Sequence, residues 1–258
     1  MTALLTEVSR AEVSEAEVRA ALGTVVDPEL DEPITDVGFV RSVSVQEGAV
    51  EVHLRLPTSF CAPNFAWLMV SDAHDAVSAV PGVESVVVEL DDHHDSDLIN
   101  RGMAAGLGYR GTFGHEAEES LDELRATFQR KAHTAAMERA ITALVRTDPA
   151  VDVAALTLGD LPVGEHTTDA LLRRRATLGL PVDDGAPVLV HDDGTRPDPA
   201  QAEMVLRRAR SVRISVDGNA HFCRGLLTTR YPGSEADQAP RPEDRPMLPL
   251  TVSKGTHP

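Results

Sequence analysis

The segment from Pro57 to Asn64 separates two patterns of apolar residues and fixes where a strand must end and a helix must begin. Apolar and polar residues alternate up to Leu56, which is typical of a strand with one buried face. Pro57 ends this strand, and Pro63 has the fixed φ that suits the first turn of a helix. Cys61 therefore lies just ahead of a helix N-terminus, where the helix dipole favours a metal-binding thiolate. The alternative, which position alone leaves open, is a small buried apolar residue.

The first third of the chain has the pattern of a small α+β domain, a sheet covered by helices on one face. Ser14 and Glu17 are spaced as a capping box at the start of a short helix. The expected elements follow in the order helix, hairpin, helix and strand, over residues 14–26, 39–56, 63–80 and 83–90. The predicted fold class is therefore α+β, with this sheet domain at the N-terminus.

Four motifs in this region resemble the metal-sulfur cluster assembly domain of the PaaD and SufT type, over about residues 14–92. They are Asp27-Pro28-Glu29-Leu30, Asp36-Val37-Gly38-Phe39-Val40, Thr58-Ser59-Phe60-Cys61-Ala62-Pro63 and Gly82-Val83-Glu84-Ser85-Val86. The resemblance implies that Cys61 is the reactive, catalytic residue and that it handles a transient iron or iron-sulfur cluster. Asp27, Glu29 and Thr58 are the cofactor-binding residues implied with it. Ala62 departs from the family pattern, in which a proline directly follows the cysteine.

The acidic motif at Asp27-Pro28-Glu29 has two interpretations from its residue types. In the first, Pro28 stiffens a turn while Asp27 accepts hydrogen bonds from backbone N–H groups. In the second, Asp27 or Glu29 lies near Cys61 and serves as an oxygen ligand for a transient iron. We expect a mainly structural role for Asp27 and Pro28, and the residue types leave Glu29 open.

Residues 91–97 hold two imidazoles and four carboxylates, a density that can build a nitrogen and oxygen site for iron or zinc. The candidate ligands are His93, His94 and Asp95. The alternative is a solvated connection whose acidic residues cap the helix that starts near Asp95.

A second pair of candidate ligands lies far along the chain, at His221 and Cys223. The sequence predicts a strand over residues 220–227, and its alternation would place both side chains on one face. Two ligands do not make a site, so Cys61 or the histidine-rich residues 91–97 would have to complete it. Alternatively, Cys223 is a core residue and His221 lies at the sheet surface.

The rest of the chain has the pattern of a connector, a second domain and a tail. The predicted domains are 14–92, a glycine-rich loop and helical connector at 93–147, a second small α+β domain at 150–231, and an extended tail at 232–258. In the second domain we expect helices over 167–178 and 199–210, and strands over 187–191, 212–216 and 220–227.

The composition excludes several classes of partner. The chain has 24 lysines and arginines against 41 acidic residues, and its net charge of −17 disfavours nucleic acid and membrane surfaces. Two cysteines are too few for a disulfide framework and favour a reducing compartment, so we expect a cytoplasmic protein. No apolar run approaches membrane-spanning length, and no phosphate-binding loop is present.

These observations favour a maturation factor that handles iron or an iron-sulfur cluster for a client metalloprotein, and an accessory protein more than an enzyme. A multicomponent oxygenase is a candidate client by family analogy, and a homo-oligomer is left open. One alternative is a metalloenzyme whose site combines His93, His94, Asp95 and His221. Another is a metal-free adaptor that binds an oxygenase through the basic helix at 173–175 and the tail.

Overall fold

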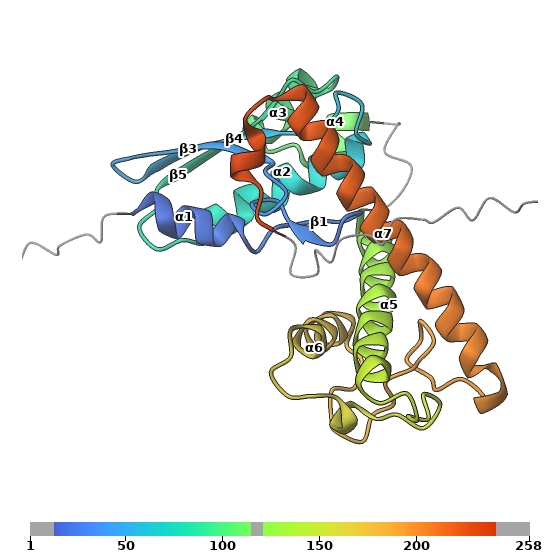
Figure 1. Ribbon diagram of the computed structural model, residues 1–258. Helices are drawn as coiled ribbons and strands as arrows, with labels where there is room; N and C mark the ends of the chain where they lie inside the picture. The colour runs from blue at the N-terminus through green and yellow to red at the C-terminus, as the bar shows by residue number, and fades with distance from the viewer. Residues whose placement is uncertain (1–12, 115–120, 241–258) are drawn as a thin grey trace, which may run out of the picture.

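The computed structural model describes residues 13–114 and 121–240. Its N-terminal part contains a three-stranded sheet with two helices on one face (Figure 1). Its elements are α1 (Glu15–Leu22), β1 (Val26–Asp27), β2 (Glu32–Pro33), β3 (Val40–Gln46), β4 (Ala49–Arg55), α2 (Pro63–Ser78), β5 (Ser85–Asp91), α3 (Ser96–Ala104) and α4 (Gly108–Phe113). The α+β class is confirmed, and so is the predicted order of helix, hairpin, helix and strand. The capping box of Ser14 and Glu17 is also present.

The sheet has the strand order β3-β4-β5, in which β3 and β4 form an antiparallel hairpin and β5 is parallel to β4. A parallel neighbour needs a crossover connection, and α2 supplies it. Val52 pairs with Val88 and Leu54 with Leu90, and all four side chains are buried. The hydrophobic face of the sheet is therefore the face on which α2 packs.

The C-terminal part is helical. Its elements are α5 (Leu121–Thr147), η2 (Leu158–Asp160), α6 (His166–Leu178), η3 (Pro199–Gln201), α7 (Ala202–Arg230) and η4 (Ser234–Asp237). Apolar side chains from α5, α6, the start of α7 and the loops between them form a second hydrophobic cluster. The start of the predicted connector helix, 116–120, and the last part of the predicted tail, 241–258, lie outside the described residues. Within the described part of the chain, no helix is long and apolar enough to cross a membrane.

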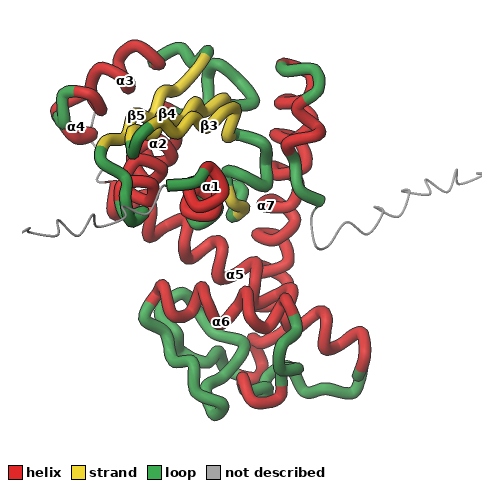
Figure 2. Tube along the Cα trace, turned by 90° about the vertical axis from the view of Figure 1, so that its left-hand side faces the viewer, coloured by secondary structure: helices red, strands yellow, loops and turns green. Residues whose placement is uncertain are grey.

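The two longest helices connect the two hydrophobic clusters (Figures 1 and 2). Ala209 of α7 belongs to the second cluster, whereas Ala220 and Leu227 are fully buried in the N-terminal core. In α5, Phe128 packs edge-on against Phe65 with ring centroids 4.9 Å apart. Helix α7 thus returns to the N-terminal domain and becomes part of its core.

All three strands predicted in the C-terminal part are wrong: 212–216 and 220–227 lie within the continuous helix α7, and 187–191 is not a strand. The C-terminal part is therefore not a second α+β domain; residues 121–240 contain no strand, and Thr157 and Pro187 form an isolated bridge. Asp217, which lies between the segments predicted as strands 212–216 and 220–227, is held inside the helix. Its carboxylate pairs with Arg213 one turn earlier at 2.8 Å and with Arg139 of α5 at 2.6 Å.

Two of the three arginines at 173–175 make contacts within the chain. Arg174 donates to the carboxylate of Asp31, with its Nε at 2.8 Å. Arg175 is only 1% exposed and donates to backbone carbonyls, including those of Pro181 and Val188. Only Arg173 of this run is exposed, so the run is not the open basic surface that the adaptor hypothesis requires.

His133 lies in α5, is 2% exposed, and its Nε2 has no hydrogen-bond partner in the structure. Burial, together with Arg175 and Arg174, lowers its pKa from the ordinary value of 6.5 to about 4. In the unfolded chain the same imidazole takes up a proton near pH 6.5. The stability contributed by the neutral form is therefore complete above pH 6.5 and is lost as the pH falls toward 4.

We expect the His133→Leu variant to lose this component of the pH dependence. The free energy of unfolding of the wild type should fall by about 3 kcal/mol more than that of the variant between pH 6.5 and pH 4. Chemical denaturation across this range measures the difference. His166→Leu, at an exposed position, is the control and should follow the wild type. Parallel pH profiles for His133→Leu and the wild type would contradict the assignment.

Candidate functional site

A cavity of about 260 Å³ lies at the N-terminal end of α2, where the N-terminal domain meets α7. Its lining combines two thiols and two carboxylates with apolar walls. The lining residues are Asp27, Glu29, Leu30, Phe39, Leu56, Pro57, Cys61, Ala62, Phe65, Met69 and Cys223. The structure therefore brings together Cys61, the acidic motif and Cys223, which the sequence could not place relative to one another.

Cys61 lies where the sequence predicts it. Ala62 is the N-cap of α2 and Pro63 is its first residue, so Cys61 directly precedes the helix. Ala62 provides no side-chain cap and the first turn has no acidic residue to offset the helix dipole, while Oδ1 of Asn64 accepts from the N–H of Phe65 at 2.9 Å. The Sγ atom of Cys61 lies 3.4 Å from Oγ1 of Thr58, at hydrogen-bonding distance for sulfur. Cys61 thus places its sulfur beside a hydroxyl group, just ahead of the positive end of a helix dipole.

Cys223 reaches the cavity from the opposite side, on α7. Burial, and then the negative groups Asp27, Cys61 and Glu29, raise the pKa of its thiol to about 12. The proposed pairing of Cys223 with His221 on one strand face is wrong. In a helix, two residues two positions apart point in different directions, and His221 lines a separate cavity with Arg224 and other residues.

The acidic motif confirms the structural interpretation of Asp27, and both of its carboxylates also lie near Cys61. Oδ1 of Asp27 accepts hydrogen bonds from the N–H groups of Glu29 at 2.9 Å and Leu30 at 2.8 Å, which makes Asp27 the structural residue of a turn. Burial raises the pKa of Asp27 to about 6, against the effect of these two donors. Glu29 accepts a hydrogen bond from Nδ2 of Asn219 in α7 at 3.1 Å. Both carboxylates also line the cavity with Cys61.

The histidine-rich stretch supports the Cys61 loop from outside the cavity. Nε2 of the buried His93 donates to the carbonyl of Cys61 at 2.8 Å, and its Nδ1 accepts from the N–H of Asp95 at 3.1 Å. His94 is exposed, and its N–H donates to the carbonyl of Ser59 at 2.9 Å. Both ring nitrogens of His93 are thus engaged, Nε2 with the Cys61 loop and Nδ1 with the backbone of its own stretch.

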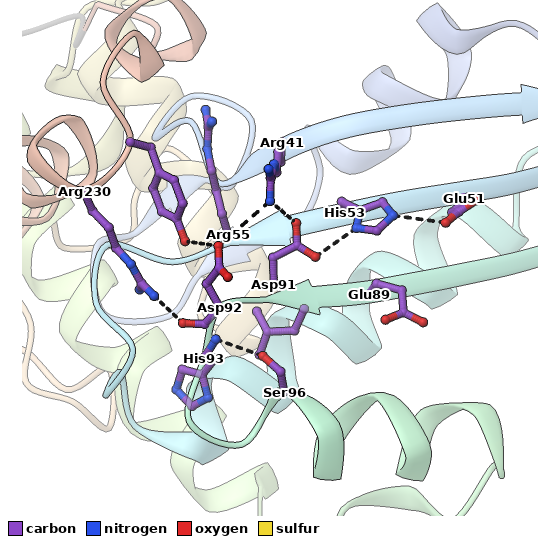
Figure 3. A network of polar contacts seen from close by, with 12 residues as sticks. Arg41, Glu51, His53, Arg55, Glu89, Asp91, Asp92, His93, Ser96 and Arg230 are labelled. Atoms are coloured by element: carbon purple, nitrogen blue, oxygen red, sulfur yellow. Dashed lines mark hydrogen bonds and ion pairs between the residues drawn. The ribbon is translucent and has the colours of Figure 1, made fainter.

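The carboxylates before these histidines are also engaged (Figure 3). Asp91 accepts from Arg41 at 2.7 Å and contacts Nδ1 of His53 at 2.9 Å. The carboxylate of Asp92 accepts from the hydroxyl of Tyr231 at 3.1 Å, and its backbone carbonyl accepts from Arg230 at the end of α7. The structure does not bring His93, His94 and Asp95 together as ligands. Across residues 13–114 and 121–240, no three histidine, cysteine or acidic side chains form a ready metal site.

Comparison with known proteins identifies similarities to the N-terminal part of the chain. Residues 15–90 match the family model described as iron-sulfur cluster assembly protein. An iron-sulfur cluster carrier protein of Mycobacterium tuberculosis is 39% identical over 77 residues, which are 30% of this chain and 20% of that protein. The chloroplastic Fe-S cluster assembly factor HCF101 of Arabidopsis thaliana is 32% identical over 82 residues, 32% of this chain and 15% of that protein. The chain thus spans about a fifth or less of the length of these relatives.

A smaller relative is covered almost completely. An uncharacterized protein of Methanocaldococcus jannaschii is 35% identical over 82 residues, which are 31% of this chain and 84% of that protein. No solved structure matches the chain. Cys61 and the acidic motif lie inside the matched region, whereas α7 and Cys223 lie outside it.

The contacts of His93 predict that it positions the Cys61 loop. Replacing it in His93→Ala removes a donor to the Cys61 carbonyl and should lower the free energy of unfolding by about 1–3 kcal/mol. The loosened loop should also let Cys61 react faster with an alkylating reagent. Both quantities can be measured in a Cys223→Ser background, where Cys61 is the one remaining thiol.

His166→Ala is the control, because this exposed residue lies in α6, whereas the ring of His94 itself contacts Phe60 of the Cys61 loop. Equal alkylation rates and equal stabilities for the His93 and His166 variants would show that the His93 contact does not position the loop.

Proposed function

Since this chain belongs, through residues 15–90, to the iron-sulfur cluster assembly protein family, we propose that it binds iron or an iron-sulfur cluster transiently at Cys61 and passes it to a client metalloprotein. The observation that carries the proposal is the position of Cys61. Its thiol lies just ahead of the N-terminal end of α2, on the wall of a cavity that Asp27 and Glu29 also line.

The donor set at this cavity suits a cargo of this kind. Thiolates are the usual protein ligands of iron-sulfur clusters and also bind ferrous iron. Carboxylate oxygens are weaker, exchangeable partners for such a metal. Oγ1 of Thr58 lies 3.4 Å from the Cys61 sulfur, at hydrogen-bonding distance. Hydrogen bonds to a ligating sulfur tune the strength of the metal–sulfur bond.

Transfer then follows from the incomplete ligand set. A site with few protein ligands leaves coordination positions that a client cysteine can occupy while the cargo is still bound. The bond from the metal to the client sulfur forms before the bond to Cys61 breaks, with no change in oxidation state. A complete set of four cysteines would hold the cargo instead, as in structural metal sites.

The client is a metalloprotein, and a multicomponent oxygenase is the candidate that the family resemblance supplies. The competing metalloenzyme hypothesis requires His93 and His221 to share a site. His93 has both ring nitrogens engaged near Cys61, and His221 lines another cavity. The carrier proposal needs neither residue as a ligand.

We expect Cys61→Ser to abolish cargo binding after anaerobic reconstitution with ferrous iron and sulfide. Iron and acid-labile sulfide per chain should fall more than about tenfold, because loss of a direct ligand exceeds the effect of losing a supporting contact. Transfer of the cluster to an apo-ferredoxin acceptor, followed by its visible absorption, should be lost in parallel. His221→Ala is the control and should load and transfer as the wild type does. Undiminished transfer by Cys61→Ser would refute the proposal.

A further inference from the structure

The sequence contains two cysteines, and the fold places both on the wall of one cavity. Cys61 comes from the loop before α2, whereas Cys223 comes from α7, outside the region that matches the family. Nothing in the local sequence around either residue requires this meeting. It arises because α7 packs back onto the N-terminal domain after passing through the second hydrophobic cluster.

The direction in which Cys223 points is fixed by contacts on both sides of it. Ala220 and Leu227, which are one turn before and one turn after it, are both 0% exposed in the N-terminal core. Asn219 donates to Glu29, and Arg224 pairs with Glu32. These contacts fix the rotation of α7 about its own axis, and this rotation directs the thiol of Cys223 toward the cavity.

The carboxylates that line the cavity differ in their ion pairing from the carboxylates that follow them at residues 31 and 32. Asp31 is paired with Arg174, and Glu32 is paired with Arg224. Asp27 and Glu29, which line the cavity, receive hydrogen bonds from backbone N–H groups and an amide, and neither has an ion pair within the described chain. The protein thus neutralises the carboxylates outside the cavity and leaves negative charge inside it.

A cysteine that served only to fill the core would be expected among apolar atoms. Cys223 packs against the apolar core, but it is only partly buried and also lines a cavity with a second thiol and two carboxylates. Desolvated acids gathered without a counter-ion destabilise a folded protein. A bound cation would remove this destabilisation, and two thiols select a soft divalent metal.

From these observations we propose that Cys223 is a second cargo ligand, and that α7 completes a two-thiol site for a thiophilic divalent metal such as ferrous iron. This inference rests on the proposed function and adds a ligand to its site. On loading, the two sulfur–metal bonds replace the sulfur–hydrogen bonds of any protonated thiol, the protons leave to solvent, and no electron is transferred. The remaining coordination positions are open to water or to a client ligand.

The test uses the full chain and Cd²⁺ alone as the probe, because thiolate-to-cadmium charge-transfer absorption counts the coordinating sulfurs. We expect the wild type to show the amplitude of two thiolates, Cys61→Ser and Cys223→Ser each about half of it, and the double variant none. The dissociation constant for Cd²⁺ should rise more than about tenfold in Cys223→Ser. His221→Ala, on the same helix but facing another cavity, should match the wild type.

A second measurement needs no substitution. In the wild type, Cd²⁺ should protect both cysteines from alkylation with the same concentration dependence, as read by mass spectrometry of the two peptides. Unchanged amplitude and affinity in Cys223→Ser, or protection of Cys61 alone, would overturn the inference. Either result would leave the carrier proposal standing on Cys61. Cluster transfer that survives Cys61→Ser would instead remove the proposed function while the two-thiol site could still bind Cd²⁺.

Discussion

The packing of α7 into two hydrophobic clusters is the constraint on which the rest of the structure depends. Ala209 packs in the helical part, and Ala220 and Leu227 pack in the core of the sheet domain. Glu138 of α5 is fully buried and is paired with Arg210 and Arg213 of α7, whose side chains are 53% and 25% exposed. Removing both arginines would leave a buried carboxylate without a partner, which is strongly destabilising, and these pairs therefore hold the two helices in one register.

This register decides the chemistry of the cavity. A sheet domain without α7 would present Cys61 and two acids on an open surface. With α7 in place, Cys223 forms the opposite wall, and Phe39, Phe65 and Met69 supply apolar surface around the thiols. Lower access of water strengthens electrostatic interactions inside the cavity. The uncompensated acids Asp27 and Glu29 then attract a cation more strongly than they would in solvent.

Features that depend on neighbouring residues could be predicted from the sequence, whereas features that depend on contacts between distant parts of the chain could not. Pro57, Pro63 and the alternation up to Leu56 are local signals, so the hairpin, the start of α2 and the placement of Cys61 followed from them. The segment 212–227 also alternates locally and contains a turn-like Asp217, but Arg139 of α5 pairs with that carboxylate from a distant part of the chain. The local pattern of apolar residues does not reveal such a contact. The helical structure of residues 212–227 and the proximity of Cys223 to Cys61 could therefore not be predicted.

In the histidine-rich stretch, residues 91–97, the composition suggested a metal site for a different reason. Imidazoles and carboxylates that ligate metals also make the hydrogen bonds that order a loop, and His93 uses both ring nitrogens for that purpose beside Cys61. Ligand density alone cannot separate these uses, because both need the same polar atoms. The distinction lies in which atoms remain available after the backbone is satisfied. Around this cavity those atoms are the sulfurs of Cys61 and Cys223, and a carrier that must release its cargo needs few such atoms.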